Sequence, residues 1–146
     1  MIIFVKSFSQ LTLEELYKVL RLRSEIFVVE QNCVYQDMDL NDQKALHVLG
    51  YLHEELVAYT RIFKPADYFK NASIGRVLVK ESYRNRKLGY DIMNASIKAV
   101  EQHFQATSIK ISAQQYLEKF YKNLGFVTVG SPYLEDGIPH IGMIKG

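Results

Sequence analysis

The most restrictive feature of this chain is a central stretch that reads strand, basic turn, helix and strand. An apolar strand is predicted over Ala72–Val79, and a charged turn follows it. Helical spacing begins near Lys87, and a short strand returns over Ser108–Ser112. Two strands joined through a helix lie parallel in one sheet, because the helix carries the chain back to the edge where it started. A β-α-β unit is therefore predicted here.

The segments around this unit indicate an α+β fold. A first strand is predicted at 1–5, and Thr12 with Glu15 forms a capping box that begins a long helix. The remaining elements are a hairpin over 45–63, a helix over 115–123 capped by Gly125, and strands at 126–129 and 140–144 around the turn 135–137. This order favours a mixed central sheet of about six to seven strands with helices on both faces.

Apolar residues at helical spacing indicate which faces of the two longer helices are buried. The first stripe consists of Leu13, Leu16, Tyr17, Leu20 and Phe27. The second stripe consists of Leu88, Ile92, Ala95, Ala99 and His103. The segment between the first helix and the hairpin, 32–44, has no such period and collects three aspartates. We expect it to be a solvated, mobile loop.

Length and charge narrow the class of protein further. A chain of 146 residues fits one domain, 1–146, with its own core. A formal net charge of +2 is too small for a general nucleic-acid or membrane-surface binder. The single cysteine, Cys33, forms no internal disulfide and fits a reducing compartment. The apolar start is too short for a signal peptide or a membrane span, so a cytoplasmic location is the default expectation.

The basic turn is the strongest candidate for a binding site. Arg84, Arg86 and Lys87 come directly before a helix, whose first amide groups and positive dipole end attract anions. Gly89 allows a close backbone approach. The turn contains neither the P-loop pattern nor the Rossmann pattern, which argues against a nucleoside triphosphate site and a dinucleotide site. The turn is therefore predicted to bind a ligand with several phosphates. A solvated turn without a ligand is the alternative explanation of the same charges.

The turn resembles the coenzyme A motif of GNAT acetyltransferases, [QR]-x-x-G-x-[GA], at Arg84-x-x-Lys87-x-Gly89. Lys87 replaces the first glycine of the motif, so we expect an ordinary backbone conformation there. Two longer stretches, 22–39 and 135–143, resemble the ElaA-type branch of this family, and nearly the whole chain is covered. The resemblance implies the GNAT fold, with acetyl-CoA as the co-substrate.

The resemblance also implies roles for individual residues. In this family the pantetheine arm of the cofactor lies between two splayed parallel strands, and an amine attacks the thioester directly. The amide of Val79 is then expected to polarise the carbonyl, and Tyr121 to protonate the departing thiolate. The predicted cofactor-binding residues are Val77, Leu78, Val79, Arg84, Asn85, Arg86, Lys87, Leu88, Gly89 and Tyr90.

The acceptor side of the site is less defined by sequence. A general base must deprotonate an ammonium acceptor, and Glu30, His47, Glu135 and His140 are all candidates. The end of the first helix commonly shapes the acceptor site in this family. Arg21 and Arg23 on that helix could meet an anionic group of the substrate, but surface solubility is the expected role of each. The residues predicted to bind the acceptor are Phe27, Glu30, Glu135 and His140. No metal is predicted, since the four histidines lack ligand spacing.

Several functions remain open at this stage. The favoured one is N-acetylation of a primary amine on a small molecule or peptide. Arg23-x-x-x-Phe27 also resembles the start of the acyl-homoserine-lactone synthase motif, which continues to a tryptophan that this chain lacks. A catalytically silent coenzyme A sensor and a small nucleic-acid module that uses the basic turn are further alternatives. Because GNAT domains often form dimers, a homodimer is an expectation of the resemblance.

Overall fold

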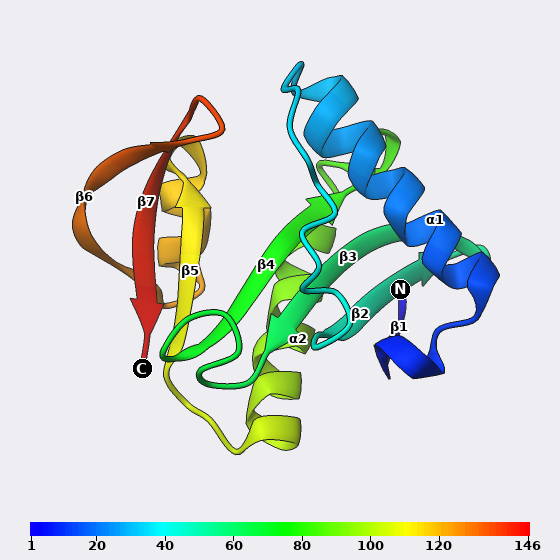
Figure 1. The fold of residues 1–146 in the computed structure, drawn as a ribbon, viewed down its shortest axis with the longest axis horizontal. Helices are drawn as coiled ribbons and strands as arrows, with labels where there is room; N and C mark the ends of the chain where they lie inside the picture. The colour runs from blue at the N-terminus through cyan, green and yellow to red at the C-terminus, as the bar shows by residue number, and fades with distance from the viewer.

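The computed structural model describes all 146 residues and contains one seven-stranded sheet. Its strand order is β1-β2-β3-β4-β5-β7-β6 (Figure 1). All neighbouring strands are antiparallel except β4 and β5, which are parallel as the sequence predicts. The strands are β1 (Ile2–Ser7), β2 (Leu46–Leu52), β3 (Glu55–Phe63), β4 (Ala72–Val79), β5 (Ile109–Gln114), β6 (Val127–Glu135) and β7 (Ile138–Lys145).

Three α-helices and several shorter turns connect the strands. The α-helices are α1 (Leu13–Arg23), α2 (Leu88–Phe104) and α3 (Glu118–Asn123). A π-helical turn, η2 (Ser24–Glu30), continues α1 directly. Single 3-10 turns are η1 (Phe8–Gln10), η3 (Glu81–Tyr83) and η4 (Gln115–Leu117). The order of strands and α-helices is the order predicted from sequence.

Local sequence signals explain where several elements begin and end. The Thr12 hydroxyl accepts a hydrogen bond from the Glu15 amide, and the Glu15 carboxylate accepts one from the Thr12 amide, so the predicted capping box is confirmed. Gly125 has φ +96 and follows the end of α3, as a left-handed cap requires. The β6–β7 hairpin turns at Asp136 and Gly137, both with positive φ.

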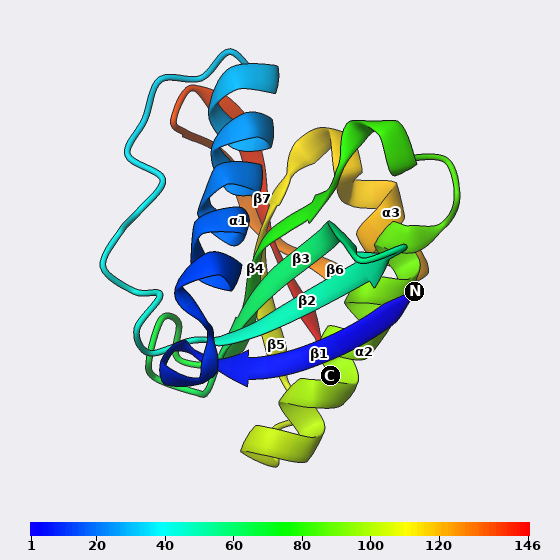
Figure 2. The same cartoon turned by 90° about the vertical axis from the view of Figure 1, so that its right-hand side faces the viewer.

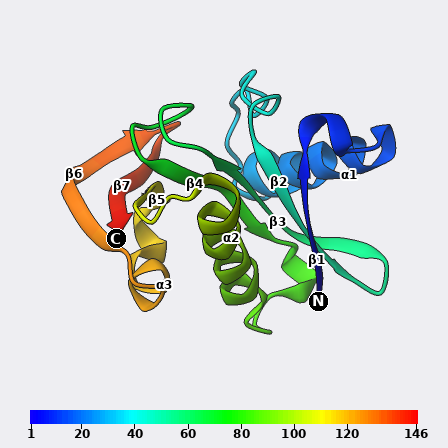
Figure 3. The ribbon, with the colours of Figure 1, turned by 90° about the horizontal axis from the view of Figure 1, so that it is seen from below.

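The helices cover both faces of the sheet, which confirms the predicted layer arrangement. Figures 2 and 3 show α1 on one face and α2 on the other. Neighbouring residues of a strand point to opposite faces, so Leu49 packs in the small core under α1 while Val48 packs in the larger core under α2 and α3. The larger core contains 19 buried residues and the smaller one contains 8.

Parts of the predicted helical stripes are wrong. Leu13 and Tyr17 are 89% and 72% exposed, and the buried residues of α1 are Val19, Leu22 and Arg23. His103, near the end of α2, is also exposed. Leu13 lies in the first turn of its helix and His103 in the last, whereas the buried residues of α1 lie after its first turn and those of α2 lie before its last turn. A periodic pattern predicts a helix, but it does not predict which turns of that helix are covered by the sheet.

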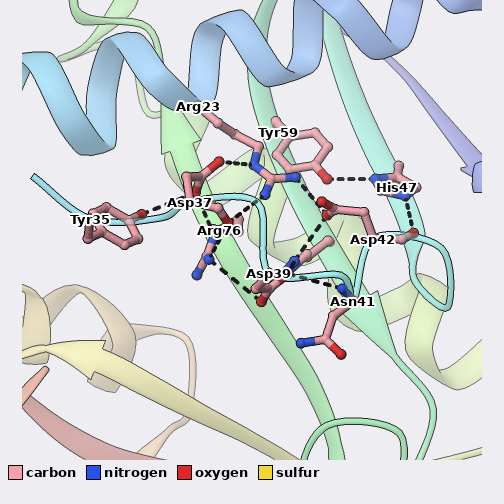
Figure 4. A network of polar contacts seen from close by, with 10 residues as sticks. Arg23, Tyr35, Asp37, Asp39, Asn41, Asp42, His47, Tyr59 and Arg76 are labelled. Atoms are coloured by element: carbon pink, nitrogen blue, oxygen red, sulfur yellow. Dashed lines mark hydrogen bonds and ion pairs between the residues drawn. The ribbon is translucent and has the colours of Figure 1, made fainter. Parts of the chain in front are cut away.

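The segment 32–44 is a surface loop, as its sequence predicts, with Val34 and Leu40 98% and 82% exposed, but its aspartates are not solvated. Figure 4 shows its aspartates binding arginines of α1 and β4. Arg23, which is fully buried, donates to Asp37 at 2.9 Å and to Asp42 at 2.7 Å. Arg61 of β3 donates to Asp39 and to Asp42, at 2.8 Å and 3.0 Å. The charges that suggested a solvated loop are therefore neutralised inside the protein.

These ion pairs also correct the role expected for Arg23, which is buried and structural rather than solubilising. Burial raises the pKa of the Asp42 carboxyl, but the hydrogen bond from Arg23 and the charges of Arg23 and Arg61 hold it below its ordinary value. Burial is likewise outweighed at Asp39, where hydrogen bonds from Arg61 and Asn41 keep the pKa well below its usual range. The segment 32–44 is thus fixed to the sheet by charge.

No helix of the structure is both long enough and apolar enough to cross a membrane.

Candidate active site

The parallel strands β4 and β5 part soon after they meet. They pair only at Ala72 with Ile109 and at Ser73 with Lys110. Opposite the following residues of β4, the register with β3 shifts by one residue, and Arg76 takes a left-handed conformation with φ +48. Such a bulge bends a strand and re-aims its side chains. The two strands therefore diverge along the rest of their length (Figure 1).

A cleft of about 700 Å³ lies where the strands diverge. Its walls come from β4, the basic turn, α2, β5, α3, the β6–β7 hairpin and η2. It gathers almost every site residue predicted from the sequence. Those that line it are Phe27, Glu30, Val77, Leu78, Val79, Arg84, Asn85, Lys87, Leu88, Gly89, Tyr90, Tyr121, Glu135 and His140.

Arg86 is the predicted cofactor-binding residue that does not line the cleft. Its guanidinium lies 5.2 Å from the ring centre of Tyr83 instead. A cation over an aromatic face is attracted by the ring quadrupole, so this contact holds Arg86 on the outside of the turn. Its contribution to an anion in the cleft is limited to long-range charge.

The basic turn differs from expectation at Lys87. This residue has φ 61 and ψ 17, a left-handed conformation, so the prediction of an ordinary backbone was wrong. The motif places glycine here because glycine adopts this conformation without strain, whereas a residue with a Cβ loses about 1–2 kcal/mol. The chain keeps the glycine geometry and places a lysine side chain at the mouth of the cleft.

The N-terminal end of α2 is open to a ligand. No side chain caps its first amide groups. Amide groups left unpaired at a helix start carry partial positive charge and bind anions. Lys87 and Asn85, which also has a positive φ of 67, are exposed beside them. This end of the cleft therefore has the geometry and charge of a phosphate site.

Arg84 is already engaged by a carboxylate across the mouth of the cleft. Its terminal nitrogens donate to the two carboxylate oxygens of Glu30 at 2.7 and 3.0 Å. Its Nε donates to the carbonyl oxygen of Val79 at 3.0 Å. The pair joins the basic turn to η2. It also occupies the carboxylate of Glu30, which is one of the four candidate bases.

Gly89 has a packing role that the sequence did not reveal. A Cβ at this position would lie 3.3 Å from two ring carbons of Phe120. The ring of Phe120 also packs against Tyr90, with ring centres 4.7 Å apart. Gly89 therefore lets α2 approach α3 closely. The group that packs against Gly89 in the structure is the ring of Phe120.

The backbone of Val79 faces the cleft side of β4. The Lys80 amide donates to the Val57 carbonyl on β3 at 2.7 Å. Because successive residues of a strand direct their backbone groups to opposite sides, the N–H and C=O of Val79 point away from β3. The hydrogen bond from Arg84 to the Val79 carbonyl agrees with this orientation.

Tyr121 lies on α3 with only 6% of its surface exposed, and it lines the cleft. Its ring packs edge-on against Phe120 and Phe126. Burial raises the pKa of the Tyr121 phenol above its ordinary value, because the charged form would lose its hydration. The phenol therefore stays protonated at neutral pH and can donate a proton.

His140 on β7 has one ring nitrogen fixed by the backbone. Nδ1 lies 2.7 Å from the carbonyl oxygen of Ile138, and a carbonyl only accepts, so Nδ1 carries the hydrogen. The neutral ring is then basic at Nε2, which lies 3.4 Å from Glu135 Oε2. His140 is 6% exposed and lines the cleft. The pair can take up a proton.

His47, a further candidate base, does not reach the cleft. Its two ring nitrogens bind the hydroxyl of Tyr59 at 2.6 Å and the carbonyl of Asp42 at 3.0 Å. Burial lowers the pKa of His47, although the Asp42 carbonyl opposes this shift. His47 is therefore a structural residue under the segment 32–44.

The structure adds cleft residues that sequence reasoning missed. They include Cys33, Tyr35, Arg76, Ser112, Gln114 and Tyr116. Ser112 and Gln114 alternate along β5, so a period-2 reading of that strand identifies them once its cleft side is known. Tyr35 had no such signal, because the segment 32–44 is held beside the sheet by ion pairs with residues distant in the chain. Arg76 adjoins Val77 on β4, but its left-handed conformation cannot be read from the sequence. Nowhere do three or more His, Cys, Asp or Glu side chains gather closely enough to hold a metal.

The fold and the cleft define an acyltransferase of the GNAT type. The family model "Acetyltransferase (GNAT) domain" matches residues 9–146, and the chain belongs to this family. Among its relatives, protein ElaA of Escherichia coli (strain K12) is 43% identical over 139 residues, which cover 94% of this chain and 91% of ElaA. The predicted resemblance to the ElaA-type branch is thereby confirmed.

Two crystal structures support the same assignment. Escherichia coli ElaA superposes with a TM-score of 0.92 at 40% identity and covers 99% of both chains. An acyl-CoA N-acyltransferase from Pseudomonas aeruginosa also superposes with a TM-score of 0.92, at 38% identity, over 100% of both chains. The predicted fold class, a mixed sheet of the acyl-CoA N-acyltransferase type, is confirmed.

Proposed function

We propose that this protein is an N-acetyltransferase that moves the acetyl group of acetyl-CoA onto a primary amine of a small molecule or peptide. One observation carries the proposal. A single cleft has a phosphate-type helix start at one end and, along its walls, a buried protonated phenol and a histidine with one basic nitrogen. These are the groups that direct transfer of an acyl group from a thioester to an amine requires.

The donor half of the cleft fits coenzyme A by charge and shape. The uncapped start of α2 and the side chains of Arg84, Asn85 and Lys87 would hold the phosphates. Val77, Leu78 and Val79 on the free edge of β4 would accompany the pantetheine arm, with Leu88, Gly89 and Tyr90 beside it. Bound there, acetyl-CoA would supply the acetyl group as a thioester. The cleft volume of about 700 Å³ lies within the range of roughly 300–1,000 Å³ that is usual for ligand pockets.

The chain's own groups divide the chemistry between them. The Val79 amide would donate a hydrogen bond to the thioester carbonyl, whose oxygen gains negative charge when the amine attacks. The Nε2 atom of His140 would accept the proton that the ammonium form of the acceptor must lose. As the new C–N bond forms and the C–S bond breaks, the Tyr121 hydroxyl would protonate the departing sulfur. The second proton that the attacking nitrogen loses on becoming an amide would then restore the Tyr121 hydroxyl. The products are an amide and free coenzyme A.

The first test is calorimetric titration of the purified protein with acetyl-CoA, with desulfo-CoA and ATP as controls. We expect acetyl-CoA to bind in the micromolar range, desulfo-CoA to bind comparably and ATP to bind much more weakly, because ATP lacks the pantetheine arm. A thiol-release assay with a panel of amines then measures transfer. Failure of acetyl-CoA to bind would overturn the proposal. Tight binding without turnover of any amine would indicate a coenzyme A sensor instead.

A further inference from the structure

A second, smaller cavity of about 60 Å³ lies beside the cleft. Four residues line both spaces: Gly75 and Arg76 on β4, Ser112 on β5 and Glu135 at the hairpin. The cavity is otherwise walled by Arg61, Ser73 and three aromatic side chains, among them the stacked pair Phe63 and Tyr68. It is therefore a side pocket of the acceptor half of the cleft, and we call it the side pocket.

Three buried polar atoms of its walls have no hydrogen-bond partner: Nε of Arg61, Oγ of Ser73 and Nε of Arg76. Arg76 Nε still lies 2.8 Å from Asp37 Oδ1 in an ion pair, whereas Arg61 and Ser73 are only 1% and 2% exposed and their two atoms have no such contact. Buried donors without partners are uncommon in folded proteins, and each costs free energy until a water or ligand satisfies it. An N–H donor and a hydroxyl together match a ligand oxygen that accepts two hydrogen bonds.

The unpaired donors of the side pocket favour an oxygen acceptor inside it, and the Glu135 carboxylate favours a cationic group at its opening. Because the arginine charges are balanced by aspartates, the donors rather than net charge set this preference. The wall of the side pocket contains the guanidinium groups of Arg61 and Arg76, whereas the aspartates that pair with them do not line it. Glu135 supplies the one carboxylate of the wall, at the opening shared with the cleft. That carboxylate lies 3.4 Å from His140 Nε2, which is the proton acceptor in the proposed reaction.

From this arrangement we infer that the side pocket binds a carboxylate of the acceptor, which is then a free amino acid. The inference rests on the proposed acetyltransferase function. The carboxylate lies against Arg61 and Ser73, while the ammonium group of the same molecule lies between Glu135 and His140. The volume suits two oxygen-sized groups, since one water occupies about 30 Å³ in the liquid. The ion pairs of the segment 32–44 then serve to hold two guanidinium groups rigidly beside the acceptor.

The boundary between the side pocket and the cleft can be altered at Gly75. A Cβ added there meets no heavy atom within 4 Å, so a side chain enters open space without displacing the protein. Because Gly75 lines both spaces, a valine would narrow the passage that the acceptor must occupy. Ser73→Ala provides a second variant, which removes one donor and adds no bulk.

The experiment measures thiol release by the full chain at saturating acetyl-CoA, with each of the twenty L-amino acids compared with its carboxamide. The carboxamide keeps the amine and the side chain but lacks the negative charge. We expect at least one amino acid to be acetylated with a kcat/KM roughly tenfold or more above that of its carboxamide, because a site with charged donors rejects an analogue that leaves them unpaired.

The variants tie this preference to the side pocket. Gly75→Val should raise KM for the preferred amino acid roughly tenfold or more and remove the preference over the carboxamide, with an unchanged Kd for acetyl-CoA. Ser73→Ala should act in the same direction by roughly severalfold. Ser131→Ala, an exposed serine on β6, is the matched control and should match the unmodified protein.

The inference is overturned, with the proposed function intact, if amino acids and their carboxamides are turned over equally or if only amines that lack a carboxylate are acetylated. A Gly75→Val variant that keeps the preference for the amino acid also overturns it. An unmodified protein that binds acetyl-CoA but accepts no amino acid also overturns it. Failure to bind acetyl-CoA at all removes the proposed function, and this inference with it.

Discussion

At the scale of the residue, the buried hydroxyl of Tyr121 is the most direct test of chemistry. Tyr121→Phe removes the proton donor and keeps the ring packing, so turnover should fall roughly 100-fold while the Kd for acetyl-CoA stays near normal. Steady-state kinetics and calorimetry on the same preparation separate the two effects. Tyr17→Phe, on the exposed face of α1, is the control. Normal turnover of Tyr121→Phe would remove the residue from the mechanism.

Lys87 combines a left-handed backbone with a positive side chain, and two substitutions separate these properties. Lys87→Gly and Lys87→Ala both remove the charge, so acetyl-CoA affinity should fall about equally, by roughly severalfold. Only glycine relieves the strain of φ 61, so Lys87→Gly should be about 1 kcal/mol more stable than Lys87→Ala. Urea unfolding measures this difference. Equal stabilities would contradict the conformation described for this turn.

Glu30 competes with a phosphate for Arg84. Glu30→Gln keeps the shape of the side chain but weakens the ion pair, which should free the guanidinium and tighten acetyl-CoA binding by roughly severalfold. Glu25→Gln is the matched control, because Glu25 lies on the same turn, η2, and pairs with Arg21 away from the cleft. Calorimetry decides, and weaker binding by Glu30→Gln would mean that Glu30 itself holds the ligand.

At the scale of the element, the segment 32–44 links stability to pH. The pKa values of Asp39 and Asp42 are lower in the folded protein than in the unfolded chain. Their contribution to stability is therefore complete above the unfolded pKa of about 4 and is lost as the pH falls below it. We expect the free energy of unfolding to decline steeply below about pH 4, as measured by urea titration at each pH.

The control for this pH effect is Asp42→Asn, which removes one titrating group. It leaves Arg23 and Arg61 without a shared carboxylate, so it should cost about 3–5 kcal/mol at neutral pH. Its stability should also vary less with pH in the acid range. Asp67→Asn, outside the network, should change neither quantity. An acid profile unaltered by Asp42→Asn would place the titrating groups elsewhere.

The same segment shows where sequence reasoning stops. Element order, the capping box and the Gly125 cap follow from residues close together in the chain, and these predictions are confirmed. The partners of Asp37 and Asp39 lie on α1, β3 and β4, so only the folded sheet reveals that the acidic side chains of the segment are charge-paired. Lys87 was misjudged for a related reason, since a motif position can keep its backbone geometry after its glycine is lost.

At the scale of the whole molecule, the sheet consists of two parts joined by two residue pairs between β4 and β5. Because acetyl-CoA would bind only the folded protein, at 100 times its Kd it should stabilise the fold by about 2.7 kcal/mol. A ligand in the cleft would contact both parts of the sheet. Hydrogen exchange should slow mainly in the diverging halves of β4 and β5 and at the start of α2. Slowing confined to β1 and β2 would place the ligand at another site.

Most of the candidate site was predicted from sequence through family resemblance, and the structure explains what the residues alone left open. The choice among the candidate bases depended on the hydrogen bond of His140 to Ile138 and on the contacts of Glu30 and His47. None of these contacts follows from a local pattern, because each depends on strand register or on a pairing between distant segments. The donor half was easier to read because its turn and helix start are contiguous.

The divergence of β4 and β5 also separates the proposed donor site from part of the proposed acceptor site. In the proposed function the donor half is built on β4 and α2, whereas Glu135 and His140 belong to the β6–β7 hairpin at the far edge of the sheet. That hairpin ends in a two-residue turn, and β6 is an exposed edge strand interrupted by an irregular stretch at 130–132. Insertions or substitutions there leave β4 and α2, which would hold the donor in the proposed function, in place. Exchange of the hairpin would therefore change the groups around the acceptor amine, while Arg61 and Ser73 of the side pocket would be kept.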